Sequence, residues 1–162
     1  MLADAAAQQL DRLARDAAGD RELERELARA YTRLGDALGR PVEANLGRTS
    51  EAGERYRTAL EFADRDADDL SLRAWTRTQL ADWLLYESRT DEALVLYDEA
   101  LELRTQLSER APHEWSSNPT LGYLHGQLAD LRTRQGRLED AAQHAQAALE
   151  FAERARAQQP TE

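Results

Sequence analysis

Three histidines, at positions 113, 125 and 144, are the residues of this chain best suited to bind a metal ion. His125 and His144 fall on two successive predicted helices, where a metal could be shared with Glu139 or Asp140. Neither helix pairs ligands four residues apart, and no HExxH motif occurs. The absence of cysteine also excludes thiolate metal sites and disulfides. The sequence therefore favours surface or boundary histidines, His113 included, and predicts no metal and no cofactor.

An acidic run over residues 64–69 resembles the first half of a calcium-binding loop. Asp64, Asp66 and Asp68 alternate as calcium ligands do, but the EF-hand pattern then needs a glycine where Asp69 stands and a glutamate where Trp75 stands. The pattern fails at both positions. The run is therefore interpreted as a solvated turn whose aspartates favour the start of the next helix through the helix dipole.

Catalytic motifs are missing as well. No serine lies in a nucleophile elbow. An acidic cleft formed by Asp82 and Asp130 is the only feature of the sequence that would support an enzymatic function. We therefore expect a protein that is not an enzyme.

Composition narrows the class of protein further. The 162 residues carry 21 positive charges, all arginine, against 31 acidic residues, for a formal net charge of −10. This balance argues against nucleic acid or an anionic membrane as the main partner, because both require clustered positive charge. No apolar run is long enough to span a bilayer, and the N-terminus lacks the pattern of a signal peptide. We expect a cytoplasmic chain, rich in the residues that favour helices.

The elements that position these residues are predicted to be seven helices. Apolar residues recur with a period of 3.6, and no stretch alternates with period two for long enough to form a strand. Asp20 is suited to cap one helix, and Gly39 followed by Pro41 ends it. The expected helices cover residues 2–17, 20–39, 49–63, 70–88, 90–110, 119–136 and 138–157.

Three segments of these helices align with one another. They begin at Glu51, Glu92 and Asp140, and each carries a small residue, then a large residue or alanine four positions later, then Ala-Leu. Leu80-Ala81 and Leu128-Ala129 each stand twelve residues before the small residue of the following segment. Small residues at these positions let antiparallel helices approach closely. The pattern therefore indicates a repeat built from helix pairs.

This pattern resembles the tetratricopeptide repeat, although the spacing here exceeds the family's typical period of about 34 residues. The stretch from Leu27-Ala28 through Tyr31 and Leu34-Gly35 to Asn45-Leu46-Gly47 also resembles the repeat region found C-terminal to some bacterial serine/threonine protein kinases. The resemblance implies an all-α, right-handed superhelical array of antiparallel helix pairs. It implies a capping helix at 1–19 and one continuous domain over 20–158, with pairs at 20–66, 70–111 and 118–158.

The resemblance also implies a concave groove lined by the first helix of each pair. The position of each residue around its helix then identifies those that lie opposite the core. These residues include arginines, aromatic residues and residues of both charges, and arginines and aromatic residues often anchor protein partners. The predicted groove residues are Arg25, Arg29, Arg33, Trp75, Thr78, Asp82, Tyr86, Tyr123, Gln127, Asp130 and Arg134. Two alternatives remain for these side chains: the aromatics pack against neighbouring helices, and the arginines pair with glutamates of their own helix.

The function expected from the sequence is a protein-interaction scaffold that binds a peptide or helical segment of a partner protein. Its own state is expected to be a monomer or a weak homodimer. Two alternatives remain open, a homo-oligomerisation module and a regulatory segment of a larger signalling protein such as a kinase.

Overall fold

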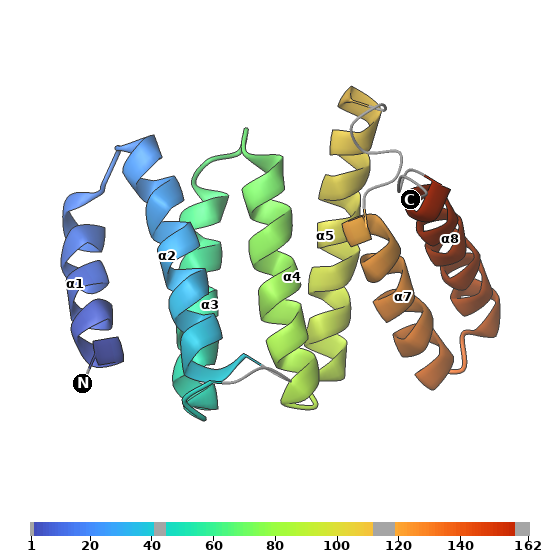
Figure 1. The fold of residues 1–162 in the computed structure, drawn as a ribbon, viewed down its shortest axis with the longest axis horizontal. Coiled ribbons are helices and arrows are strands. Elements are labelled where there is room, and N and C mark those ends of the chain that lie inside the picture. Colours follow the sequence, from blue (N-terminus) through green and yellow to red (C-terminus); the bar gives the residue numbers. More distant parts are fainter. Residues whose placement is uncertain (1, 41–44, 112–118, 158–162) are drawn as a thin grey trace. The chain divides into compact units, whose positions relative to one another are not determined.

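The computed structural model describes residues 2–40, 45–111 and 119–157. Within these residues every regular element is an α-helix, and the all-α helical-repeat class expected from the sequence is confirmed (Figure 1). The predicted boundaries agree with the observed ones to within a few residues. The segment from His113 to Asn118 lies outside the described residues, as do Pro41 and Ala44. The helices are α1 (Leu2–Asp16), α2 (Arg21–Gly39), α3 (Thr49–Asp64), α4 (Leu70–Tyr86), α5 (Thr90–Arg110), α7 (Pro119–Arg134) and α8 (Leu138–Ala157).

The chain forms two compact units, Met1–Ala93 and Leu94–Glu162. The first unit contains α1 to α4 and the first turn of α5, and the second contains the rest of α5 with α7 and α8. The boundary therefore falls inside a helix and not between two helix pairs. The expected division into a capping helix and three pairs of one continuous domain stays a prediction.

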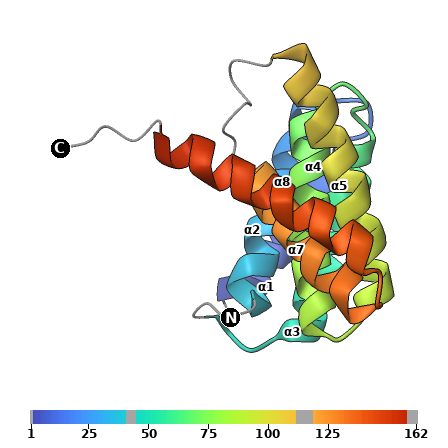
Figure 2. The same cartoon turned by 90° about the vertical axis from the view of Figure 1, so that its right-hand side faces the viewer.

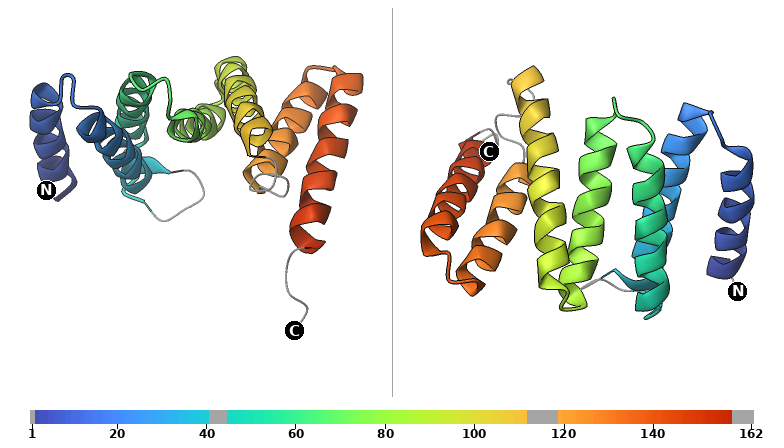
Figure 3. Two further views of the ribbon diagram at one scale, coloured as in Figure 1. Left: turned by 90° about the horizontal axis from the view of Figure 1, so that it is seen from above. Right: turned by 180° about the vertical axis from the view of Figure 1, so that it is seen from behind.

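In the first unit, successive helices run up and down (Figure 1). Contacts join α1 to α2, α2 to α3 and α3 to α4, and α2 also contacts α4. Viewed from behind, α3 stands in front of α2 (Figure 3). The side chains of Asp20 and Asp69 accept hydrogen bonds from the backbone N–H groups of Leu23 (3.1 Å) and Leu72 (2.9 Å), and so cap α2 and α4.

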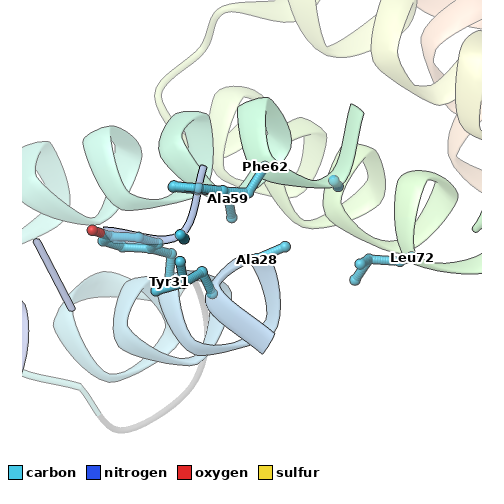
Figure 4. Packing of buried hydrophobic residues seen from close by; sticks show 8 residues of the cluster. Ala28, Tyr31, Ala59, Phe62 and Leu72 are labelled. Atoms are coloured by element: carbon cyan, nitrogen blue, oxygen red, sulfur yellow. The ribbon is translucent and has the colours of Figure 1, made fainter. Parts of the chain in front are cut away.

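The core of the first unit is a cluster between α2, α3 and α4 (Figure 4). The rings of Tyr31 and Phe62 stack with centroids 5.9 Å apart. Ala28 and Ala59 are fully buried, and their small side chains let the backbones of α2 and α3 come close. Small residues in the repeat segments therefore serve helix–helix contact, as the pattern predicts.

Two buried tyrosines tie neighbouring helices together. Tyr31 of α2 donates a hydrogen bond to Asp11 of α1 at 2.8 Å, and Tyr56 of α3 donates one to Asp36 of α2, also at 2.8 Å. Both hydroxyls therefore keep a partner although their rings are only 1–2% exposed.

The second unit is organised around α7. Its buried residues recur every three or four positions, which places them on one face; they are Leu121, Leu124, Leu128 and Leu131. Helix α8 packs across α7 (Figure 2), and an ion pair between Asp98 and Arg132 (2.7 Å) joins α5 to α7. Ala141 is the only residue of α8 that is buried.

Candidate functional site

The acidic run at 64–69 is held by arginines. Asp64 accepts hydrogen bonds from both terminal nitrogens of Arg77, at 2.7 and 3.0 Å, and from Arg73. Asp66 accepts from Arg25 and from the backbone N–H of Asp68. The carboxylates that would have to ligate calcium thus already have positively charged partners, and the interpretation as a turn explains their positions better.

Asp66 shows how strong this arrangement is. Its side chain is almost fully buried, and burial alone would raise the pKa of its carboxyl group. The hydrogen bonds from Arg25 and from the N–H of Asp68 together outweigh that effect and hold the pKa of Asp66 below its ordinary value. Asp66 is therefore ionised at neutral pH.

Two of the predicted groove arginines belong to this network. Arg25 pairs with Asp66 and lies 3.8 Å from Asp69, and Arg29 pairs with Glu26 at 2.7 Å and lies 3.7 Å from Asp69. Asp69, the cap of α4, thus lies between them. These contacts support the alternative in which the arginines pair with carboxylates, although most of the partners come from the 64–69 turn and not from α2 itself.

Two predicted groove residues of α4 are less exposed to solvent than their positions around the helix indicate. Trp75 is partly buried and packs against the core cluster, which is the structural alternative expected for it. Thr78 is only 5% exposed, and its hydroxyl donates to the carbonyl oxygen of Ala74 at 2.9 Å. The prediction that Thr78 offers a polar group to a partner is corrected: its hydroxyl already has a partner in its own helix.

Three other predicted residues remain accessible in the first unit. Arg33 is exposed and makes no ion pair with any residue that the structure describes. Tyr86 is 57% exposed at the C-terminal end of α4, and Asp82 is half-buried one turn before it. Because α2 and α4 are in contact and run in the same direction (Figure 1), these three side chains belong to the C-terminal halves of neighbouring helices.

The remaining predicted residues lie in the second unit, on α7. Tyr123 is 41% exposed, and Gln127 is half-buried one turn further on. Asp130 and Arg134 form an ion pair with each other at 2.8 Å across one helical turn. The four residues recur every three or four positions and so lie on one side of α7. Asp82 and Asp130, which together suggested an acidic cleft, belong to different units.

His125 and His144, which the sequence favours as surface or boundary residues, are half-buried and lie side by side between α7 and α8. His125 Nδ1 and His144 Nδ1 are 2.9 Å apart, and the ring of Phe151 stacks on His125. Burial lowers the pKa of both imidazoles, and for His125 the neighbouring His144 lowers it further. Glu139 and Asp140 do not complete a metal site, because no three His, Asp or Glu side chains among the described residues are grouped to hold an ion.

Sequence reasoning missed the role of Asp66 and Asp69 as partners of the groove arginines. The acidic run was a visible signal, but Arg25 and Asp66 are 41 residues apart and no local pattern connects them.

None of the described helices is both long enough and apolar enough to cross a bilayer.

Comparison with known proteins agrees with this geometry. Residues 42–106 match the family model for the tetratricopeptide repeat, so the chain carries tetratricopeptide repeats over α3, α4 and most of α5. The matched segment also covers the 64–69 turn, Trp75, Asp82 and Tyr86. Such repeats form a non-catalytic fold that generally mediates protein–protein interaction.

A solved structure shows the same fold. The crystal structure of BtubC (BKLC) from P. vanneervenii matches with a TM-score of 0.65 and 22% sequence identity, over 94% of this chain and 56% of that one. The chain thus spans little more than half the length of BtubC, and the likeness concerns the fold alone. No curated protein matches the sequence.

Proposed function

We propose that the chain is a protein-interaction scaffold, and that it binds a peptide or helical segment of a partner on the surface formed by Arg33, Asp82 and Tyr86. The observation that carries the proposal is their accessibility on the C-terminal halves of two neighbouring helices, of which α4 lies within the residues that match the tetratricopeptide repeat. The N-terminal halves are less suited to binding, because Arg25 and Arg29 are engaged by the acidic turn.

The side chains indicate what the partner must offer. Tyr86 presents a large exposed ring, which suits an apolar or aromatic side chain of the partner. Arg33 presents a guanidinium group that can pair with a carboxylate in two parallel hydrogen bonds. A partner segment with an acidic residue near an apolar one would satisfy both. A net charge of −10 therefore does not require a basic partner.

Tyr123, Gln127, Asp130 and Arg134 stay predicted binding residues of the second unit. Tyr123 is the exposed aromatic of this set, and the pairing of Asp130 with Arg134 is exposed to solvent and easily exchanged for a partner's charge. A cytoplasmic location, the exclusion of nucleic acid and a regulatory role in a kinase-like signalling protein also stay predictions.

The experiment uses peptides selected from a phage-displayed random library on the immobilised wild-type chain. Affinities of the selected peptides are then measured by fluorescence anisotropy for Tyr86→Ala and Arg33→Ala. Each substitution removes an anchor, and we expect a loss of about tenfold or more. Val95→Ala, an exposed apolar residue on α5, and Arg110→Ala, an exposed arginine at its end, serve as matched controls.

The two outcomes are distinct. Peptides that bind the controls like the wild type and lose affinity on the Tyr86 and Arg33 variants support the proposed surface. Peptides that bind all four variants equally contradict it, provided that circular dichroism shows each variant to be folded. If only Tyr123→Ala loses binding, the peptides bind the second unit and not the proposed surface.

A further inference from the structure

The two histidines between α7 and α8 form a cluster that the proposed scaffold function does not use. His125 Nδ1 and His144 Nδ1 are 2.9 Å apart, the ring centroids are 5.2 Å apart, and the ring planes are tilted by 42°. Both side chains are half-buried, so the pair is not sealed from solvent. Without an ion, one Nδ1 carries a proton and donates a hydrogen bond to the other.

The distance between the two nitrogens suits one transition-metal ion. Imidazole nitrogens bind such ions at about 2.0–2.1 Å. Two nitrogens 2.9 Å apart then meet at the ion at an angle of about 90°, whereas a tetrahedral angle needs a separation of about 3.3 Å. The right angle is typical of the tetragonal geometry of Cu(II) and Ni(II). A rotation of the two rings turns both lone pairs towards the ion, and the shared proton moves to Nε2 of its own ring.

The surroundings of the pair suit a bound cation. Burial lowers the pKa of both imidazoles, and a neutral imidazole is the form that binds a metal. The charges of Asp98 on α5 and Asp140 on α8 raise the pKa of His144, so they favour positive charge at this place. Arg132 of α7 opposes them, but it is itself paired with Asp98 at 2.7 Å.

We propose that His125 and His144 bind one divalent transition-metal ion, preferably Cu(II), which joins α7 to α8. No third His, Asp or Glu is grouped with them among the described residues, so water fills the remaining positions and the ion exchanges readily. The bridge matters for α8, because Ala141 is the only residue of this helix that is buried. The ion therefore stabilises the second unit, as any ligand that prefers the folded chain does.

The test titrates the untagged chain with chloride salts of Cu(II), Ni(II), Zn(II) and Mg(II) at neutral pH in isothermal titration calorimetry. One Cu(II) per chain is expected, bound more tightly than Ni(II) or Zn(II), and Mg(II), which prefers oxygen ligands, is expected not to bind. His125→Gln and His144→Gln each remove one ligand and are expected to weaken Cu(II) binding about tenfold or more. His113→Gln, at the third histidine of the chain, is the matched control and is expected to bind like the wild type.

Two further measurements use the wild-type chain and so do not depend on the folding of a variant. Electron spin echo spectra of the Cu(II) complex detect the outer nitrogens of coordinated imidazoles, and two imidazoles are expected. Thermal unfolding followed by circular dichroism is expected to shift to higher temperature when Ni(II) is added. The same shift should be absent in His144→Gln, whose spectrum without metal shows whether the variant is folded.

The proposal fails on any of three results. Cu(II) that does not bind, or that binds equally to the wild type and to both histidine variants, would show that the pair is not the site. A spectrum with a single imidazole would show that the two histidines do not share the ion. An unfolding midpoint that falls on addition of Ni(II) would show that the ion prefers the unfolded chain and does not bridge the folded helices.

Discussion

The indole ring of Trp83 lies against the backbone of Gly53, so closely that a Cβ atom on Gly53 would fall 2.3 Å from Cζ2 of the ring. The indole Nε1 also donates a hydrogen bond to the carbonyl oxygen of Thr49 at 2.9 Å, and the guanidinium group of Arg57 lies 5.0 Å from the ring centroid. One side chain of α4 is thus fixed against α3 on several sides, and glycine is the residue that leaves room for it.

Gly53→Ala is therefore expected to destabilise the chain, although alanine normally favours a helix. The added methyl group forces Trp83 or α3 to move, at a cost of about 1–3 kcal/mol in the free energy of unfolding. Gly126→Ala on α7 is the matched control, because a Cβ there meets no atom within 4 Å, and it should be neutral or mildly stabilising. The urea concentrations at the unfolding midpoints of Gly53→Ala and Gly126→Ala measure the two effects. Equal midpoints would contradict the packing described for Trp83.

Tyr56→Phe is expected to lower the free energy of unfolding by about 1 kcal/mol, because the ring stays packed and only the hydrogen bond to Asp36 is lost. Tyr86→Phe, whose hydroxyl belongs to an exposed ring, should leave stability unchanged. Chemical denaturation at neutral pH measures both, and a Tyr56→Phe variant as stable as the wild type would show that the hydrogen bond contributes nothing.

The same tyrosine predicts a loss of stability in alkali. Burial, with the hydrogen bond to Asp36, raises the pKa of Tyr56 well above its ordinary value of 10.0. The unfolded chain therefore releases this proton first, and stability falls as the pH rises above about 10. The unfolding midpoint should change little from about pH 8 to about pH 9.5 and drop as the pH rises beyond about 10, and it should drop less in Tyr56→Phe. If Tyr56→Phe loses as much stability in alkali as the wild type does, groups other than Tyr56 cause the loss.

Asp66→Asn is expected to weaken the chain at neutral pH, because the buried amide cannot replace the charge that pairs with Arg25. Since the pKa of Asp66 is lower in the folded chain than its ordinary 3.8, its contribution is present above that pH and is lost on acidification. The variant should therefore be less stable near neutral pH and also less sensitive to acid.

Asp68→Asn is the control for Asp66, since Asp68 is 83% exposed and touches Arg21 only at 3.5 Å. Its unfolding curve should follow that of the wild type from neutral to acid pH. If the Asp66 and Asp68 variants behave alike, the buried ion pair does not hold the turn.

The histidine pair predicts an acid-sensitive contact between α7 and α8. Because burial lowers the pKa of His125 and His144 below 6.5, the unfolded chain binds protons more readily and stability falls as the pH drops below that value. Asp98 and Asp140 oppose this shift at His144, whereas Arg132 adds to it. The thermal midpoint should fall between about pH 7.5 and about pH 5.5, and His125→Gln should reduce the change. Equal pH profiles would contradict the prediction.

The sequence predicted the helices and the repeat because their signals are local. Asp20 caps α2 by a contact three residues away, and the buried leucines of α7 recur with helical spacing. The accessible face of α4 was harder to predict. Buried residues occur all around this helix, and a buried threonine such as Thr78 bonds to its own helix and so looks like a surface residue in the sequence. The pairing of Arg25 with Asp66 depends on the packing of α2 against the turn, which no local pattern encodes.

The two tyrosine–aspartate links have a kinetic consequence. Each spans 20 residues and joins helices that follow one another in the chain, so these two contacts form over short loops. Contacts between successive helices favour fast folding, which can begin at more than one helix pair. Helix α1 has no buried residue. It is held by the hydrogen bond from Tyr31, by ion pairs of Asp4 with Arg48 and of Asp11 with Arg55, and by the packing of Leu10 and Ala14 against the core cluster. Its amide hydrogens should exchange with solvent before those of α2 and α3, so opening of the first unit starts at its N-terminal end.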